Sequence, residues 1–204
     1  MPDWPQILRN LVSSITYRLS HDIHTTEDTV RYYFFLQLVD SGVSPDQMIL
    51  ERPHPHPAMQ QKEIDLSVIQ PDGIWDFEIK YHRPIPSGRN RPRTQLRGQL
   101  VSDFYKLAMS DSTHSYVLYI ADPKMAAHWE TAMPELRSQG QNPPPSLTSG
   151  WLAAQPITLR NEINRNIGTI PEGLVVQVAT TAVHKTHEIS AWLYEVTAVS
   201  LLRI

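Results

Sequence analysis

The segment 63–81 has the sequence EIDLSVIQPDGIWDFEIKY and predicts two short strands joined by a tight turn. Apolar and polar residues alternate in both halves of the segment, which is the period-two pattern of a β-strand. Between the halves, the residues QPDG at 70–73 place proline second and glycine fourth, an arrangement that suits a type I turn. The segment therefore predicts a β-hairpin.

The turn also sets which residues of the two strands lie opposite each other. With this four-residue loop, Ile69 faces Ile74 and Asp65 faces Glu78. Directly opposed Cβ atoms lie about 4.5–5.5 Å apart, so the two carboxylates would meet and could bind a divalent cation through oxygen. Lys80 lies two residues beyond Glu78 and is expected on the same face. A three-residue loop with a bulge would shift this register.

Glu63 falls opposite Lys80 in the same register, and two interpretations are open for it. Its carboxylate is either a further cation ligand on this face or an ion-pair partner of Lys80, which is the commoner role of a facing Glu and Lys. The alternative for the whole group is an ordinary half-exposed hairpin with scattered charges. The apolar surroundings of Glu78 favour a site near the edge of the core.

The spacing of Asp65, twelve residues, and then Glu78-Ile79-Lys80 resembles the motif of the PD-(D/E)XK phosphodiesterase superfamily, the restriction-endonuclease-like nucleases. The resemblance implies that Asp65 and Glu78 bind Mg²⁺, for which Mn²⁺ can substitute, together with the backbone carbonyl of Ile79. It also implies that Lys80 orients or activates the attacking water. Ile64 stands where the family motif has proline, a residue without a chemical role there.

Two helices are expected before the hairpin. Residues 4–20 carry apolar side chains at helical spacing. The second helix is expected to begin at Thr25 or Thr26, which offer an N-cap followed by acidic residues. Members of the superfamily often add an acidic residue from a preceding helix to the site, so the resemblance makes Glu27 the candidate and Asp28 its competitor. The alternative for Glu27 is an interaction with the helix dipole alone.

A basic segment follows the hairpin. Residues 82–98 have the sequence HRPIPSGRNRPRTQLRG, without an acidic residue, and hold five arginines: Arg83, Arg89, Arg91, Arg93 and Arg97. Next to a phosphodiesterase site they are expected to contact the DNA backbone, and the alternative is a solvated surface segment. In the helix expected over 94–110, Gln95, Gln99 and Asp103 share one face. We interpret that face as a polar surface, although some members of the superfamily use a Gln there to support the site.

The remaining patterns predict a single α/β domain over residues 1–204, with a central mixed sheet of five or six strands flanked by helices. The expected order matches the αβββαβ core of the restriction-endonuclease-like fold and ends in two late strands. Outside the hairpin, the expected elements are strands at 48–52, 115–121, 174–180 and 189–199, a helix at 124–138, and a proline-rich surface loop at 141–150.

Composition restricts the classes of function. The 204 residues include no cysteine, which excludes disulfides, thiol nucleophiles and cysteine-bound zinc. His184 and His187 do not follow the H-E-x-x-H order of zinc peptidases. The net charge of −3 means that any nucleic-acid site must be local. No apolar run is long enough to span a bilayer and no signal peptide is evident, so a cytoplasmic protein without a membrane partner is expected.

Together these patterns predict a Mg²⁺-dependent DNA endonuclease of the restriction or defence type. Such enzymes commonly pair to cut both strands, and the apolar C-terminal region, 191–204, is expected to supply part of a homodimer contact. The alternative for this region is a plain buried strand. Two alternatives stay open. One is a non-catalytic nucleic-acid-binding or assembly module that keeps the nuclease fold, and the other is a hydrolase acting on a different phosphate ester.

Overall fold

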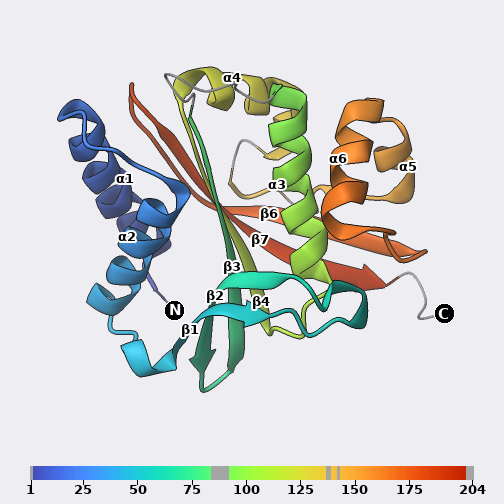
Figure 1. The fold of residues 1–204 in the computed structure, drawn as a ribbon, viewed down its shortest axis with the longest axis horizontal. Helices are drawn as coiled ribbons and strands as arrows, with labels where there is room; N and C mark the ends of the chain where they lie inside the picture. The colour runs from blue at the N-terminus through green and yellow to red at the C-terminus, as the bar shows by residue number, and fades with distance from the viewer. Residues whose placement is uncertain (1, 84–91, 137–138, 142, 201–204) are drawn as a thin grey trace.

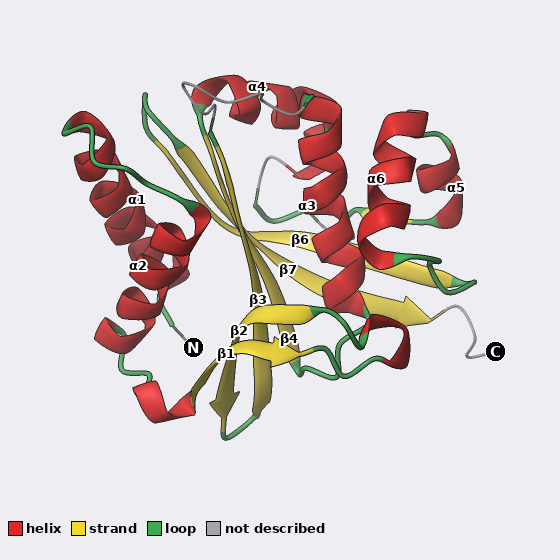
Figure 2. Cartoon of the chain, viewed as in Figure 1, coloured by secondary structure: helices red, strands yellow, loops and turns green. Residues whose placement is uncertain are grey.

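The computed structural model describes residues 2–83, 92–136, 139–141 and 143–200. It is an α/β structure in which helices cover both faces of one seven-stranded mixed sheet (Figures 1 and 2). The helices are α1 (Trp4–Ser20), α2 (Glu27–Asp40), α3 (Arg93–Ala108), α4 (Pro123–Ala132), α5 (Ser149–Ala153) and α6 (Ile157–Ile167). The strands are β1 (Met48–Pro53), β2 (Glu63–Gln70), β3 (Gly73–His82), β4 (His114–Ala121), β5 (Ser146–Leu147), β6 (Leu174–Lys185) and β7 (Ser190–Ser200), in the sheet order β1-β2-β3-β4-β7-β6-β5.

The sheet separates two hydrophobic layers. One layer packs α1 and α2 against β2, β3, β4 and parts of β6 and β7, and the other packs α3, α4 and α6 against β4, β6 and β7. Strand β4 shows the division clearly, because Tyr116 and Leu118 face the first layer while Val117 and Tyr119 face the second. The two helical layers lie on opposite sides of the sheet in Figure 1.

The two N-terminal helices form where the sequence predicts them. The apolar stripe of α1, from Trp4 to Ile15, is buried against the sheet. Thr26 is the N-cap of α2, and its hydroxyl accepts a hydrogen bond from the backbone nitrogen of Thr29 at 3.2 Å. The cap makes Glu27 the first residue of α2. This end of the helix lies nearest to β3, the second strand of the hairpin.

The hairpin register is confirmed over the part of β2 and β3 that is paired. Ile69 lies opposite Ile74, and the ladder continues to the pair of Leu66 and Phe77. It ends one pair before Asp65, so Asp65 and Glu78 are not partners in a continuous ladder. The strands separate at this point, and the carboxylates occupy the space that further backbone pairing would have filled.

The crossover after β3 completes the predicted core order. Strand β3 pairs in parallel with β4, and α3 connects the two across one face of the sheet. The elements α2, β1, β2, β3, α3 and β4 therefore follow one another as αβββαβ. This order places β3 between β2 and β4. The N-terminus of α2 and one face of α3 lie close to the C-terminal end of β3.

The C-terminal half differs from expectation in three respects. The sheet has seven strands rather than five or six, because β5 falls inside the predicted loop 141–150. Helix α4 ends at Ala132, before the predicted limit at residue 138, because Met133 leaves the helical conformation and Pro134 follows it. Helices α5 and α6 are not predicted from the sequence, and α6 packs against α3 through Leu159 and Ile163.

The region 191–204, which is expected to supply a dimer contact, is mostly interior in its described part, and the homodimer itself stays a prediction. Strand β7 lies between β4 and β6 in the interior of the sheet, and Trp192, Leu193 and Tyr194 are fully buried within one chain. A central strand is covered on both faces, which explains its apolar composition without a partner. Residues 201–204 lie outside the described part, and no helix of that part is long and apolar enough to cross a membrane.

Candidate active site

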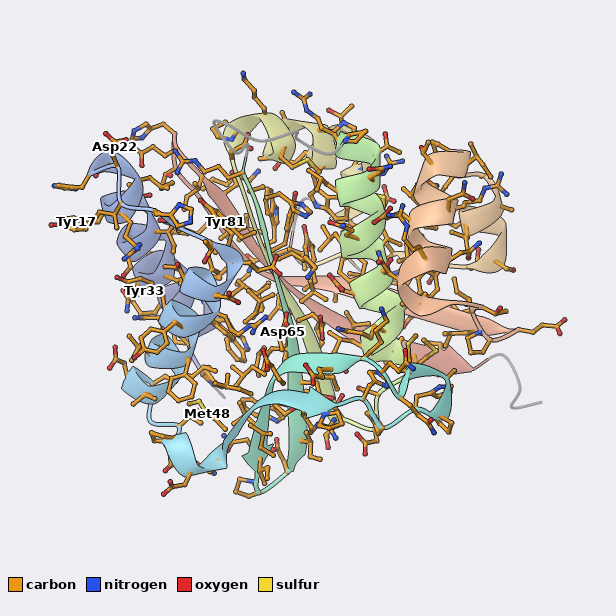
Figure 3. The ribbon with its side chains drawn as sticks, in the orientation of Figure 1. Tyr17, Asp22, Tyr33, Met48, Asp65 and Tyr81 are labelled. Atoms are coloured by element: carbon orange, nitrogen blue, oxygen red, sulfur yellow. The ribbon has the colours of Figure 1, made fainter. Side chains whose placement is uncertain are left out.

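The predicted site residues meet where β2 and β3 separate, between the first turn of α2 and one face of α3. Asp65 comes from β2, Glu78 and Lys80 come from β3, and Glu27 opens α2. Figure 3 labels Asp65 at this point, between the helical layers. The side chains lie at the boundary between the core and solvent, where the surrounding elements fix their positions.

Asp65 is held from two directions and its side chain is only 15% exposed. Its Oδ2 accepts a hydrogen bond from the backbone nitrogen of Ile79 at 2.7 Å, in place of a strand-to-strand bond. Its Oδ1 accepts one from Arg31 of α2 at 2.8 Å. Arg31 also contacts Glu51, a residue with a φ of 54° in β1. Asp65 therefore ties β2, β3 and α2 together.

Glu78 is the most deeply buried carboxylate of the site, with a side chain that is 1% exposed. Its Oε1 accepts a hydrogen bond from the backbone nitrogen of Asp65 at 3.4 Å, and its Oε2 lies 2.6 Å from Nζ of Lys106. Burial raises the pKa of Glu78 to about 8; Lys106 opposes this rise and Asp65 adds to it. The two predicted carboxylates thus each bind the backbone of the other's strand.

Lys80 is enclosed by acidic groups from two helices. Its Nζ lies 3.3 Å from Oε1 of Glu27 and 3.8 Å from Oδ2 of Asp103 in α3. Burial alone would lower the pKa of Lys80, but Asp103 and Glu27 raise it above its ordinary value. Lys80 is therefore a permanently charged ammonium, and it does not pair with Glu63, whose side chain is exposed.

The structure selects between the two acidic candidates of α2. Glu27 binds Lys80 and accepts a hydrogen bond from the backbone nitrogen of Tyr81 at 3.1 Å. Asp28 is 84% exposed and contacts only Arg31 in the described structure, at 3.6 Å. Glu27 is therefore brought to Lys80, whereas Asp28 lies on the outer surface of the helix.

Two charged residues of α3 belong to the site and are not predicted by sequence reasoning. Asp103 and Lys106 face β3, whereas the sequence analysis interprets the face of Gln95, Gln99 and Asp103 as a polar surface. Asp103 is 7% exposed, and burial raises its pKa to about 6 although Lys80 opposes the rise. Its Oδ2 has no hydrogen-bond partner among the described residues. The signal in the sequence was the i, i+3 spacing of Asp103 and Lys106, which places both on the same face of the helix.

An open cleft of about 560 Å³ lies beside these groups. Its lining includes Lys80, Asp103 and Lys106, together with Asn166 of α6. The rest of the lining is Glu27, Lys62, Tyr81, His82, Arg83, Leu96, Gln99, Ser102 and Ile167. Helix α6, which the sequence did not predict, therefore shapes the entrance to the site.

The five predicted phosphate-binding arginines fall into different environments. Arg83 lines the cleft, and Arg93 is exposed at the start of α3. Arg97 is 7% exposed and lies 3.5 Å from Oε1 of Gln155, and burial lowers its pKa, so its guanidinium does not lie on an open surface in the described structure. Arg89 and Arg91 lie outside the described residues.

The candidate ligands of the site are of the type that a hard divalent cation prefers. Asp65, Glu78 and the carbonyl of Ile79 offer only oxygen, which is the ligand type that Mg²⁺ prefers. Both carboxylates are, however, occupied by cationic side chains, Arg31 and Lys106. Within the described ranges, no group of three or more His, Cys, Asp or Glu side chains is arranged to hold a metal ion. Cation binding would therefore require an exchange of these ion pairs.

Comparisons with known proteins add no identification. The chain matches no protein-family model, no curated protein and no solved structure. Function is therefore inferred from the residues of the site and from the order of the elements that carry them.

Proposed function

We propose that this chain is a Mg²⁺-dependent DNA endonuclease of the restriction-endonuclease-like, PD-(D/E)XK type. The observation that carries the proposal is the convergence of Asp65, Glu78 and Lys80 with Glu27 at the splayed end of β2 and β3. The αβββαβ order of the surrounding elements supports it independently of the acidic residues. A restriction or defence role is the expected biological setting by analogy alone.

The energetics of the site also support a chemical role. Four acidic side chains and three basic ones, Glu27, Asp65, Glu78, Asp103, Arg31, Lys80 and Lys106, are gathered in one partly buried group. Burying charges is expensive even when they are paired, and apolar residues would fill the same space at lower cost. Raised pKa values for Glu78 and Asp103 beside an open cleft are typical of functional sites.

The roles of the residues follow from their positions. Mg²⁺ bound by Asp65, Glu78 and the Ile79 carbonyl would supply charge stabilisation at the phosphate and a lower pKa of bound water. Lys80, charged and adjacent to these ligands, would orient the attacking water or neutralise charge that develops on the phosphate. Glu27 fixes the ammonium of Lys80 from the opposite side through its contact at 3.3 Å.

The rim of the cleft favours a polyanionic substrate. Lys62 and Arg83 both line it, and both are exposed. These side chains could contact successive phosphates without reading the bases, as backbone contacts usually do. An extended strand could contact Lys62 and Arg83 with one phosphate directed to Lys80, whereas a small phosphate ester would contact fewer of these side chains.

A non-catalytic DNA-binding module is the second candidate, and one observation favours it. Arg31 and Lys106 neutralise Asp65 and Glu78 in the described structure, so the fold is internally satisfied without a metal ion. On this alternative, the rim would bind DNA and the carboxylates would serve only the fold. The two candidates differ in whether DNA is cut.

Supercoiled plasmid incubated with the purified chain in Mg²⁺ or in excess chelator separates these candidates. We expect cleavage only with Mg²⁺, and its loss in Asp65→Asn, Glu78→Gln and Lys80→Ala. Glu172→Gln, an exposed acid far from these residues, is the matched control and should cut normally. Binding without cutting would favour the module, and preferential hydrolysis of RNA or of a small phosphate ester would change the substrate class. Open circles or linear products would show whether single or paired copies act.

A further inference from the structure

We infer that Lys106 is an internal counter-ion that occupies Glu78 in the metal-free protein and leaves it when a divalent cation binds. This inference rests on the proposed function, because it concerns the same carboxylates. It assigns a positioning role to a residue of α3 that the motif resemblance does not include. The ammonium of Lys106 competes with the divalent cation for one carboxylate oxygen.

The contacts of Lys106 support this role. Its Nζ lies 2.6 Å from Oε2 of Glu78 and donates a hydrogen bond to the backbone carbonyl of Glu63 at 2.8 Å. The side chain is 13% exposed, so the ammonium is held rather than solvated. Its place in the last turn of α3 would suit the helix dipole, but a dipole interaction does not require contact with a buried carboxylate.

The ion pairs of the site indicate that Lys106 is the basic residue that can most readily leave its carboxylate. Lys80 is directed to Glu27 and Asp103, and Lys106 is the ion-pair partner of Glu78 within the described residues. Arg31 forms ion pairs with Asp28 and Glu51 as well as with Asp65. It would therefore retain two ion pairs if Asp65 bound a metal ion. Among the described residues, the direct partners of the Lys106 ammonium are Glu78 and the carbonyl of Glu63, while Asp103 and Asp65 attract it without an ion pair.

A divalent cation at Glu78 could not coexist with Lys106 in its present place. Two positive charges at one carboxylate oxygen repel strongly in a poorly solvated site. Lys106 also lines the 560 Å³ cleft, so its ammonium has a direct route to water. Binding of the cation is therefore coupled to displacement of Lys106. Because the Lys106–Glu78 ion pair must be broken, its free energy lowers the affinity for the cation.

The test compares Mg²⁺ affinity in Lys106→Gln with that in wild type, measured by calorimetry and by the Mg²⁺-induced shift of the unfolding temperature. Glutamine keeps hydrogen-bonding ability but removes the charge, so we expect Mg²⁺ to bind about tenfold more tightly. The measurements are made at alkaline pH, where carboxylates are ionised. Lys124→Gln removes an exposed lysine that does not line the cleft and should leave the affinity close to that of wild type.

A second measurement uses the wild-type protein and does not depend on the folding of a variant. Reductive methylation followed by mass spectrometry reports how accessible each lysine is. We expect Mg²⁺ to raise the methylation rate of Lys106 relative to that of the exposed Lys62. An unchanged rate at Lys106 while Mg²⁺ binds would overturn the inference.

The outcomes separate this inference from the proposed function. If wild type binds Mg²⁺ and cuts DNA but Lys106→Gln behaves like Lys124→Gln, the counter-ion role is wrong and the nuclease proposal stands. If neither wild type nor Lys106→Gln binds Mg²⁺, both are wrong. Tighter binding confined to Lys106→Gln supports the inference, whether or not DNA is cleaved.

Discussion

Replacing Asp103 by asparagine should flatten the pH dependence of stability, because this buried carboxyl resists ionisation. Burial raises the pKa of Asp103 from the ordinary 3.8 to about 6, against the attraction of Lys80. A carboxyl whose pKa is higher in the folded than in the unfolded state stabilises the fold when protonated. That contribution is complete below 3.8 and is lost as the pH rises through about 6.

The size of the effect follows from the shift. One pKa unit corresponds to about 1.4 kcal/mol, so a rise of roughly two units amounts to about 3 kcal/mol. Asp103 is 7% exposed, so solvent screens this contribution little. Between about pH 4 and about pH 7, the unfolding free energy of wild type should fall by about 3 kcal/mol relative to that of Asp103→Asn.

Urea unfolding of both proteins across this pH range measures the difference directly. Asp28→Asn is the control, because its carboxylate is 84% exposed and its substitution should leave the pH profile of wild type unchanged. A difference between wild type and Asp103→Asn that stays flat, or that grows in favour of wild type as the pH rises, would refute the reasoning. It would mean that Lys80 outweighs the burial of Asp103.

Three further predictions concern neighbouring contacts. Glu27→Gln should lower the cleavage rate roughly hundredfold, since Lys80 loses an anchor; Asp28→Asn should change the rate far less, and equal losses would contradict the assignment. Arg52→Met should lower the unfolding free energy by about 3–5 kcal/mol in urea titrations, because it leaves the fully buried Asp76 without its ion pair at 2.8 Å. A loss below about 1 kcal/mol would show that Asp76 does not need the ion pair. Arg83→Ala should lower the slope of log affinity for duplex DNA against log salt by about 1, and an unchanged slope would place the DNA elsewhere.

The hairpin and the crossover could be predicted from the sequence because local patterns determine them. The alternation in 63–81 and the turn at 70–73 fix the register of the paired part, and the helix after β3 follows from its apolar spacing. The order αβββαβ then brings Asp65, Glu78 and Lys80 together. The end of the ladder at Leu66 was not predictable, because the carboxylates replace backbone bonds only once the tertiary structure exists.

The remaining parts of the site depend on contacts between distant segments. A polar helical face usually means solvent, but in α3 it packs on the charged end of β3, so Asp103 was assigned to the wrong environment and Lys106 was not recognised as part of the site. Helix α6 is short and largely polar, and its position comes from packing against α3. The apolar composition of β7 fits both a dimer surface and a strand buried on both faces, so composition alone could not decide between them.

The role of Lys80 in DNA cleavage is the central claim, and single-turnover cleavage by Lys80→Met at saturating Mg²⁺ and DNA tests it most directly. In the proposed mechanism the ammonium acts at the reacting phosphate, so we expect the rate to fall by about 10²–10³ with DNA affinity nearly unchanged. Lys124→Met, which changes an exposed lysine of α4, should cut as wild type does. Near-normal cleavage by Lys80→Met would contradict the proposed active site.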